Sequence, residues 1–304
     1  MNIKKLMKSD VIGIVCPSHI ADPVRYERYI KVLESLGFRV KMGANVYKTT
    51  HGYIASEKER ADDFNAMVCD PEVKMVFFGG GEGGNEILPF INYEKIKCNP
   101  KIYCSYSDGT SILNAIHTLT GLIVYYGQAP GNFGDLWYYD YEQFMTNFVG
   151  DLYNESFGFI KNSEWRTING GVCEGTLIGG YSAAFALQLG GGFLNYNANK
   201  KYILILEDYI KLSSVAAISS YISHIEQHEF IKSVSGLIFG HYSDNVPEDL
   251  IKRLTRFGEK FNVPVVYCDD FGHGVNHGIL PIGINAELDA NKQTLLFKYE
   301  NGQL

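Results

Sequence analysis

The strongest local signal in the chain is one stretch, Lys101-Ile102-Tyr103-Cys104-Ser105-Tyr106-Ser107-Asp108-Gly109-Thr110-Ser111-Ile112-Leu113. Its first half is aromatic and β-branched, which predicts a buried strand, and the residues from Thr110 onward have helical spacing. Such a strand–turn–helix passage is the setting of a nucleophile elbow, in which the turn raises a serine hydroxyl above the sheet edge at the positive end of the helix. Ser107 is therefore a candidate nucleophile, with Ser105 at the first glycine position of the G-x-S-x-G pattern. A helix cap is the alternative role for Ser107 or Asp108.

Strand and helix patterns alternate on both sides of this stretch, as they do in βαβ units with a parallel sheet. Apolar runs predict strands at Val11–Cys16, Arg39–Met42, Val73–Phe78, Lys101–Tyr106, Tyr202–Leu206, Val234–Phe239, Val263–Tyr267 and Thr294–Tyr299. Helical spacing predicts helices at Arg25–Leu36, Ser56–Val68, Thr110–Leu119, Tyr141–Leu152, Ser213–Gln227 and Pro247–Phe261. We expect an α/β fold with three parts: an N-terminal parallel-sheet α/β domain that carries the nucleophile elbow (residues 1–126), a connecting segment (127–170) and a smaller C-terminal mixed α/β domain (171–304).

Length and composition limit the classes of protein that need to be considered. A chain of 304 residues exceeds what one hydrophobic core usually holds, so two domains are expected. The formal charge of −7 and the pI near 5.6 argue against a nucleic-acid partner, because such binding relies on clustered Lys and Arg. The six cysteines are scattered without a C-x-x-C pair, which indicates reduced thiols. The first apolar run is too short for a signal peptide and no run is long enough for a membrane span, so a cytoplasmic protein is expected.

A glycine-rich run, Gly79-Gly80-Gly81-Glu82-Gly83-Gly84, follows the third expected strand. It formally fits the dinucleotide fingerprint G-x-G-x-x-G, with Asp108 at roughly the expected spacing of about 20 residues. A dinucleotide site, however, follows the first strand and opens a helix, whereas Pro89 interrupts the helix here. An oxyanion-hole amide from Gly80 or Gly81 fits the run as well. We expect no cofactor, and a dinucleotide-binding or non-catalytic protein is the alternative.

Two histidines in a glycine-flanked loop, His273 and His277, are the candidates for a base that activates the serine. The loop follows an expected strand and can present an imidazole to a cleft. A metal site formed by the pair requires a helix, which the glycines of this loop make unfavourable, so no metal is expected. The acid that orients the base is expected to be Glu207 or Asp208, at the end of the strand Tyr202–Leu206.

A series of different short motifs extends along nearly the whole chain in a specific order and spacing. They are Ile12-Gly13-Ile14-Val15-Cys16-Pro17-Ser18, Glu59-Arg60-Ala61-Asp62-Asp63-Phe64-Asn65, the glycine run, Asn99-Pro100-Lys101, Tyr106-Ser107-Asp108, Glu174-Gly175-Thr176-Leu177-Ile178-Gly179-Gly180, Ile205-Leu206-Glu207-Asp208, Phe271-Gly272-His273 and Leu280-Pro281-Ile282-Gly283. With these motifs, the chain resembles the LD-carboxypeptidase family of serine peptidases, which includes the microcin C immunity carboxypeptidases.

The resemblance implies a function and a set of site residues. It implies a serine carboxypeptidase that hydrolyses an amide bond through an acyl-enzyme, acting on L,D-linked murein peptides or on microcin C-like peptidyl or aminoacyl nucleotides. The implied triad is Ser107, Glu207 and His273, with oxyanion amides at Asp108 and at the Gly80–Gly81 turn. The serine is expected on the N-terminal domain, the acid and base on the C-terminal domain, and the protein as a homodimer. A serine esterase with another substrate is a further alternative.

Two positions of the glycine run depart from the family pattern. Many members have Arg and Tyr where this chain has Gly79 and Glu82, so both positions are candidates for substrate binding and for a change of specificity. The loss of Arg favours the microcin-immunity-like subgroup. Trp165 is a further candidate for substrate binding, together with Trp137, because an indole can stack on a nucleobase.

Overall fold

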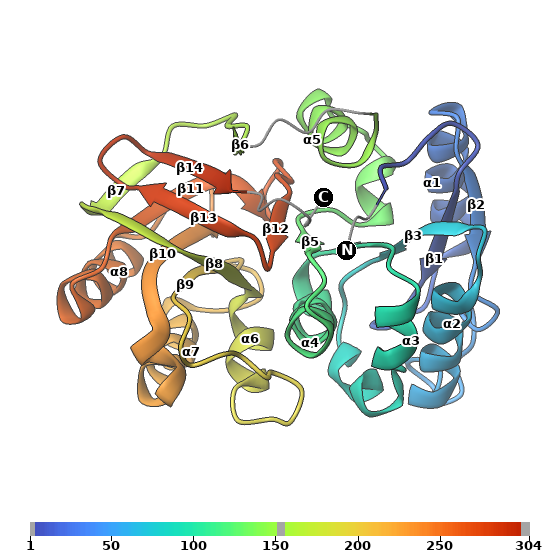
Figure 1. The fold of residues 1–304 in the computed structure, drawn as a ribbon, viewed down its shortest axis with the longest axis horizontal. Helices are drawn as coiled ribbons and strands as arrows, with labels where there is room; N and C mark the ends of the chain where they lie inside the picture. The colour runs from blue at the N-terminus through green and yellow to red at the C-terminus, as the bar shows by residue number, and fades with distance from the viewer. Residues whose placement is uncertain (1–3, 151–155, 299–304) are drawn as a thin grey trace.

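The computed structural model of the protein describes residues 4–150 and 156–298, and the statements below refer to these residues. They form two β-sheets with helices around them (Figure 1). The last residues of two expected elements, the helix Tyr141–Leu152 and the strand Thr294–Tyr299, lie outside the described residues. So do the outermost residues of the two expected domains.

The first sheet is the parallel sheet expected in the N-terminal half. Its strands are β1 (Val11–Val15), β2 (Arg39–Met42), β3 (Val73–Phe78), β4 (Ile102–Ser105), β5 (Val124–Tyr126) and β12 (Leu280–Ile282). They are ordered β12-β5-β4-β3-β1-β2, and every pair is parallel except β12 with β5. β12 comes from the C-terminal half of the chain, so the two halves share this sheet.

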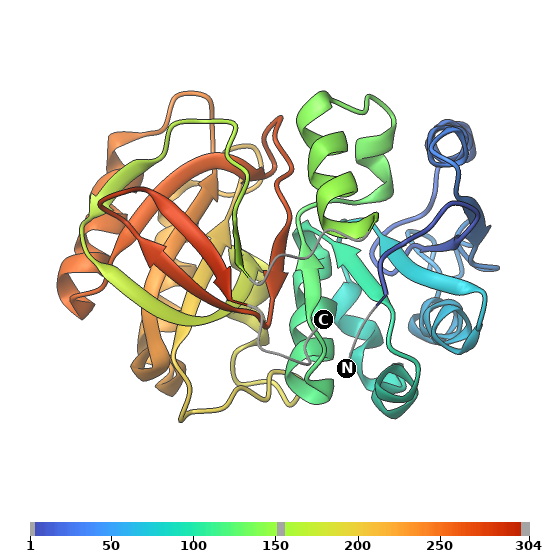
Figure 2. The same cartoon turned by 45° about the horizontal axis from the view of Figure 1, so that its top comes forward.

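Helices cover both faces of the first sheet (Figure 2). α2 (Glu57–Cys69), α3 (Tyr93–Cys98) and α4 (Thr110–Thr120) lie on one face, and α1 (Pro23–Ser35) and α5 (Tyr138–Phe148) on the other. α2 begins with a capping box, in which the Glu59 N–H donates to the Ser56 hydroxyl and the Glu59 carboxylate accepts from the Ser56 N–H. Among the described helices, none is long and apolar enough to cross a membrane.

The second sheet is mixed and strongly curved (Figure 2). Its strands are β6 (Ser156–Gly158), β7 (Arg166–Asn169), β8 (Val172–Tyr181), β9 (Tyr202–Glu207), β10 (Val234–His241), β11 (Val265–Gly272), β13 (Asn285–Asp289) and β14 (Thr294–Lys298). They are ordered β6-β14-β13-β8-β9-β10-β11-β7, with β8 to β11 parallel and the remaining pairs antiparallel. α6 (Ser182–Gln188), α7 (Val215–Gln227) and α8 (Glu248–Phe261) lie together on one side of this sheet (Figure 1).

The mixed sheet of the C-terminal half agrees with the expected fold class, and it has eight strands against six in the first sheet. The segment expected as a connection, residues 127–170, packs on the first sheet and adds strands to the second. Its helix α5 covers the first sheet, and its strands β6 and β7 are the two edge strands of the second.

α4 lies between the two sheets, which explains why it is apolar on several sides. Ile112, Leu113 and Ile116 are all completely buried. Asn114 is equally buried, and its amide exchanges two hydrogen bonds with Gly179 of β8: Nδ2 donates to the glycine carbonyl at 2.8 Å, and Oδ1 accepts from the glycine N–H at 3.1 Å. A buried amide needs such partners, and here they fix the helix against the second sheet.

Candidate active site

Ser107 lies at a sharp turn between β4 and α4. It begins a single 3₁₀ turn, Ser107–Gly109, that runs directly into α4. Its φ is +57°, a left-handed conformation that is uncommon for a residue other than glycine and is typical of a nucleophile elbow. A Cβ on Gly109 would lie 2.1 Å from the Ser105 hydroxyl, so the turn requires glycine there. Neither the Ser107 nor the Asp108 side chain caps this helix, which removes the alternative role considered for them.

The Ser107 hydroxyl belongs to a hydrogen-bonded chain with an imidazole and a carboxylate. Ser107 Oγ lies 2.9 Å from Nε2 of His273, and Nδ1 of His273 lies 2.8 Å from Oε2 of Glu207. Glu207 is completely buried, and Ser107 is 7% exposed. The three residues come from β4–α4, from the end of β9 and from the loop after β11, so both sheets contribute to the site.

Tyr126 closes this chain into a ring, and the sequence interpretation did not identify it. Its hydroxyl donates to Oε1 of Glu207 at 2.5 Å and accepts from the backbone N–H of Ser107 at 3.0 Å. Burial and the nearby carboxylate raise the pKa of Tyr126 well above its usual range, so the hydroxyl stays a donor. No sequence motif marks Tyr126. The only available signal is its place at the end of β5, beside the end of β4 in the same parallel sheet.

Glycines make room for the Glu207 carboxylate beneath the histidine loop. A Cβ on Gly272 would lie 2.8 Å from Glu207 Oε2, and a Cβ on Gly240 would lie 2.9 Å from Glu207 Cβ. Gly272 also has a φ of +104°, which strongly favours glycine. Gly272 therefore allows the chain to turn closely over Glu207, which brings His273 within hydrogen-bonding distance of the carboxylate.

The surroundings of His273 favour an imidazole that accepts a proton readily. Burial by itself lowers the pKa of an imidazole, but the Glu207 carboxylate outweighs it, so the pKa of His273 is raised above its ordinary value. Rings of Tyr106, Tyr181 and Tyr209 surround it, with centroids 5.3, 5.4 and 6.1 Å away. An imidazolium formed during a reaction would therefore face a carboxylate and three aromatic rings.

Of the two candidate bases, His273 is the one hydrogen-bonded to Ser107. His277 instead pairs with Asp140 of α5, through Nδ1 to Oδ2 at 2.9 Å and through its backbone N–H to Oδ1 at 3.0 Å. This pair joins the histidine loop to the helix that covers the first sheet. His277 therefore holds the loop in place, and His273 is directed at the serine.

Of the two candidate acids, only Glu207 is hydrogen-bonded to His273 among the described residues. Asp208 is completely buried, and its Oδ1 accepts from the Tyr209 N–H at 2.8 Å. Burial raises the pKa of Asp208 to about 7. Glu207 is thus the acid in contact with His273, while Asp208 fixes the backbone before Tyr209, the residue whose ring is stacked on His273.

The glycine run passes directly over the serine. A Cβ on Gly80 would lie 2.4 Å from Ser107 Cβ, and a Cβ on Gly81, whose φ is +144°, would lie 2.1 Å from the Ser18 carbonyl oxygen. Only glycine permits this approach. The run continues into a 3₁₀ helix, Gly84–Phe90, and not into the α-helix that a dinucleotide site uses. This placement favours the oxyanion interpretation over the dinucleotide one.

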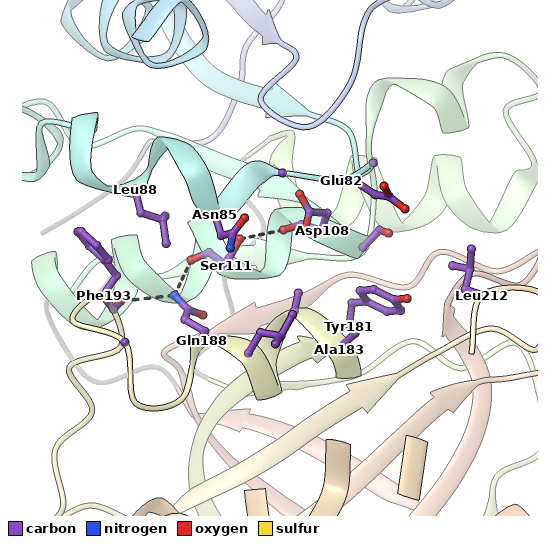
Figure 3. Close-up of a pocket in the computed structure, with 16 residues that line it drawn as sticks. Glu82, Asn85, Leu88, Asp108, Ser111, Tyr181, Ala183, Gln188, Phe193 and Leu212 are labelled. Carbon is purple, nitrogen blue, oxygen red and sulfur yellow. Dashed lines mark hydrogen bonds between the residues drawn. The ribbon is translucent and has the colours of Figure 1, made fainter. Parts of the chain in front are cut away.

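A pocket of about 460 Å³ opens beside Ser107 (Figure 3). It lies between the first half of the chain and α6 of the second. The residues that line it are Gly81, Glu82, Gly83, Asn85, Leu88, Ser107, Asp108, Ser111, Tyr181, Ala183, Ala184, Leu187, Gln188, Gly191, Phe193 and Leu212. Of the predicted site residues, the structure places Ser107, Asp108, Gly81 and Glu82 on its wall.

Two candidates for substrate binding do not line the pocket. A Cβ on Gly79 would lie 2.9 Å from Cε1 of His19, so the imidazole occupies the space next to this glycine. Trp165 is 4% exposed, and its indole N–H donates to Asp270 at 2.7 Å. The expectation that Trp165 stacks on a nucleobase is therefore wrong, because a buried indole needs a partner for its N–H and finds it within the core. Trp137 is exposed before α5, outside the pocket.

Comparison with known proteins places this chain in a family. Residues 12–127 match the N-terminal domain of LD-carboxypeptidases, and residues 174–288 match their C-terminal domain. The probable murein peptide carboxypeptidase of Bacillus subtilis is 28% identical over 97% of this chain and 93% of its own length. A solved MccF-like protein of Bacillus anthracis superposes with a TM-score of 0.88 at 25% identity, covering 99% of this chain and 100% of that one. The microcin C7 self-immunity protein MccF of Escherichia coli, solved with aspartyl sulfamoyl adenosine, superposes with a TM-score of 0.87 at 25% identity, covering 99% of both chains.

Proposed function

Because the chain belongs to the LD-carboxypeptidase family of serine peptidases, we propose that Ser107, His273 and Glu207 are the catalytic triad of a serine carboxypeptidase. The observation that carries the proposal is the unbroken path from Ser107 Oγ to His273 at 2.9 Å and on to Glu207 at 2.8 Å. Both distances lie in the range over which a proton is passed between heavy atoms. A pocket for a small substrate opens beside the same hydroxyl.

The first half of the reaction forms an acyl-enzyme. Nε2 of His273 takes the Ser107 proton as Oγ bonds to the carbonyl carbon of the scissile amide. The imidazolium then gives this proton to the amide nitrogen, the carbon–nitrogen bond breaks, and the amine leaves. In the second half, water attacks the ester, with His273 again as base, and releases the acid and free Ser107. Glu207 holds the N–H of Nδ1 throughout and stabilises the imidazolium.

Backbone amides near Ser107 supply the oxyanion site in this proposal. Asp108 follows the serine in the first turn of a helix, where N–H groups lack intrahelical partners. Gly80 lies against the Ser107 side chain, so the N–H groups of the Gly80–Gly81 turn are the second donors in this proposal. Losing one such donor costs about 3 kcal/mol of transition-state stabilisation in comparable enzymes.

Two substrate classes follow from the relatives, and one panel of compounds separates them. We expect cleavage of an L,D-linked murein tetrapeptide, of an aminoacyl sulfamoyl adenosine, or of both, with release of the terminal amine measured by chromatography. A simple aryl ester is the control for a serine esterase. Turnover of the ester alone would contradict the carboxypeptidase assignment. The implied homodimer and the cytoplasmic location stay predictions, and the triad does not require the former because all three residues come from one chain.

The pH dependence of kcat/KM is expected to follow the protonation of the His273 imidazole. The base must be neutral to accept the serine proton, so activity falls as the pH drops through its pKa. Since the pKa of His273 is raised, the midpoint of this acid limb is expected above the ordinary imidazole value of about 6.5. Initial rates at low substrate concentration between pH 5 and 9 check this. A midpoint below the ordinary value would show that another group limits the reaction.

A further inference from the structure

One side chain of the glycine run faces the pocket, and it is a carboxylate. Among residues 79–84 only Glu82 has a side chain, and it lies on the pocket wall (Figure 3). The backbone around it is held firmly. The Glu82 N–H donates to the Ser18 carbonyl at 2.8 Å, and the two glycines that follow are hydrogen-bonded to Arg60 and Asp108. The run therefore presents this carboxylate at a defined place near Ser107.

The Glu82 carboxylate has no partner of its own among the described residues. It is solvent-exposed and takes part in no ion pair or side-chain hydrogen bond there. Glu86, four residues later, is different: its carboxylate pairs with the buried guanidinium of Arg60. The Arg60 guanidinium is therefore already paired with Glu86, and the Glu82 carboxylate is left available to a ligand.

The charge of the pocket wall is entirely negative. Its charged lining residues are Glu82 and Asp108, and no Lys, Arg or His of the described chain lines it. Lys211 precedes the lining residue Leu212, but its ammonium lies over the ring of Tyr209, 5.5 Å from the centroid. Asp108 accepts the Gly84 N–H at 2.6 Å, and burial raises its pKa. Glu82 is thus the charged lining residue whose carboxylate is exposed and takes part in no hydrogen bond among the described residues.

A second lining residue adds an unused acceptor. Gln188 of α6 is 7% exposed, and its amide nitrogen donates to the carbonyls of Ser111 and Phe193, at 2.8 and 3.5 Å. Because both partners are acceptors, the amide cannot be reversed, and its oxygen has no partner among the described residues. That oxygen is itself buried, so the feature of this pocket that is open to a ligand is the negative charge of its wall, which suits a cationic group.

We propose that this pocket selects substrates with an ammonium group on the side chain of the residue at the acyl side of the scissile amide, and that Glu82 is the specificity-determining residue that binds it. The inference rests on the proposed hydrolysis at Ser107 and adds the charge class of its substrate. Lysine-type aminoacyl or peptidyl compounds fit this description. Acidic ones, such as the aspartyl compound bound in the solved MccF complex, place like charge against Glu82 and are expected to be disfavoured.

The test compares three substrates that differ in one side chain on the acyl side of the scissile bond: lysine, Nε-acetyl-lysine and glutamate. They are prepared on each of two leaving groups, D-alanine and sulfamoyl adenosine. For wild type, we expect kcat/KM to be about fivefold higher with the lysine substrate than with the acetyl-lysine substrate. This is the factor that corresponds to the loss of one solvent-accessible ion pair. We expect wild type to favour lysine over glutamate by more than about tenfold. Affinities of Ser107→Ala for the same compounds, measured by calorimetry, give the ranking without turnover.

Three variants test whether Glu82 causes the preference for the lysine substrate. Glu82→Gln is expected to remove the difference between lysine and acetyl-lysine, and Glu82→Lys to favour glutamate. Glu94→Gln, the same change at an exposed residue of α3, is expected to leave all ratios as in wild type. A lysine preference that survives Glu82→Gln, or equal rates and affinities for the three compounds, would overturn the inference. Absence of turnover on every compound would instead count against the proposed function, while the calorimetry still tests the charge preference.

Discussion

Ser107→Ala is expected to lower kcat by about 10⁶-fold, the loss seen when the nucleophile of a comparable triad is removed. The substitution deletes one atom, Oγ, which is the group directed at His273. It leaves the Cβ, the turn and the hydrogen bond from the Ser107 N–H to Tyr126 in place. The protein should therefore unfold at an unchanged temperature and still bind substrate. Steady-state rates and thermal unfolding of the same preparation measure both effects.

A matched control and a chemical readout make this result specific. Ser220→Ala changes an exposed serine of α7, whose hydroxyl donates to the Ala216 carbonyl within its own helix, and should leave kcat unchanged. A fluorophosphonate should label wild type on the peptide that contains Ser107 and leave Ser107→Ala unlabelled. Activity within tenfold of wild type in Ser107→Ala would disprove the proposed mechanism.

Glu207→Gln is expected to lower kcat by about 10⁴-fold, as the equivalent acid-to-amide change does in a serine protease triad. The structure supplies the reason. The Tyr126 hydroxyl donates to one oxygen of Glu207, so in the variant it selects the amide oxygen and turns the amide nitrogen toward His273. Nδ1 then accepts a hydrogen bond from the amide instead of donating one, so the ring proton resides on Nε2, where the N–H faces Ser107. This tautomer cannot take the serine proton.

The pH profile distinguishes this effect from general damage. Without the carboxylate, the pKa of His273 loses the interaction that raises it, so the acid limb of the remaining activity should move to lower pH. Glu174→Gln, at a surface residue of β8 paired with Lys298, is the matched control and should retain full activity. A loss of less than tenfold in Glu207→Gln, with the acid limb unmoved, would show that Glu207 does not orient the base.

Much of the secondary structure is predictable because its causes are local. The apolar run Val73–Phe78 is β3 with the same bounds, and the Ser56 capping box starts α2 as expected. Both features depend on residues within a few positions of each other, through side-chain burial on a strand and hydrogen bonds at a helix end. The alternation of these elements is enough to predict an α/β fold with a parallel first sheet.

The pairing of distant segments is not predictable in the same way. β12 crosses from the C-terminal half to pair with β5, and nothing in the residues Leu280–Ile282 specifies that partner. β6 and β7 are short strands that gain their stability from the edges of the second sheet. The polar segment around Trp165 predicts a surface position for this aromatic residue. Long-range packing instead places it in the core.

The serine elbow is a property of local sequence, and the site around it is a property of packing. A strand, a glycine-bounded turn and a helix within residues 101–113 suffice to raise Ser107 above the sheet, because short-range backbone sterics define such a turn. From the residues alone, His273 and His277 are equivalent, as are Glu207 and Asp208; only the family resemblance separates them. Contact with Ser107 requires His273 to approach across 166 positions of the chain, and that approach depends on how the two sheets pack against α4. The same packing forms the pocket that exposes the charge of Glu82 to a substrate.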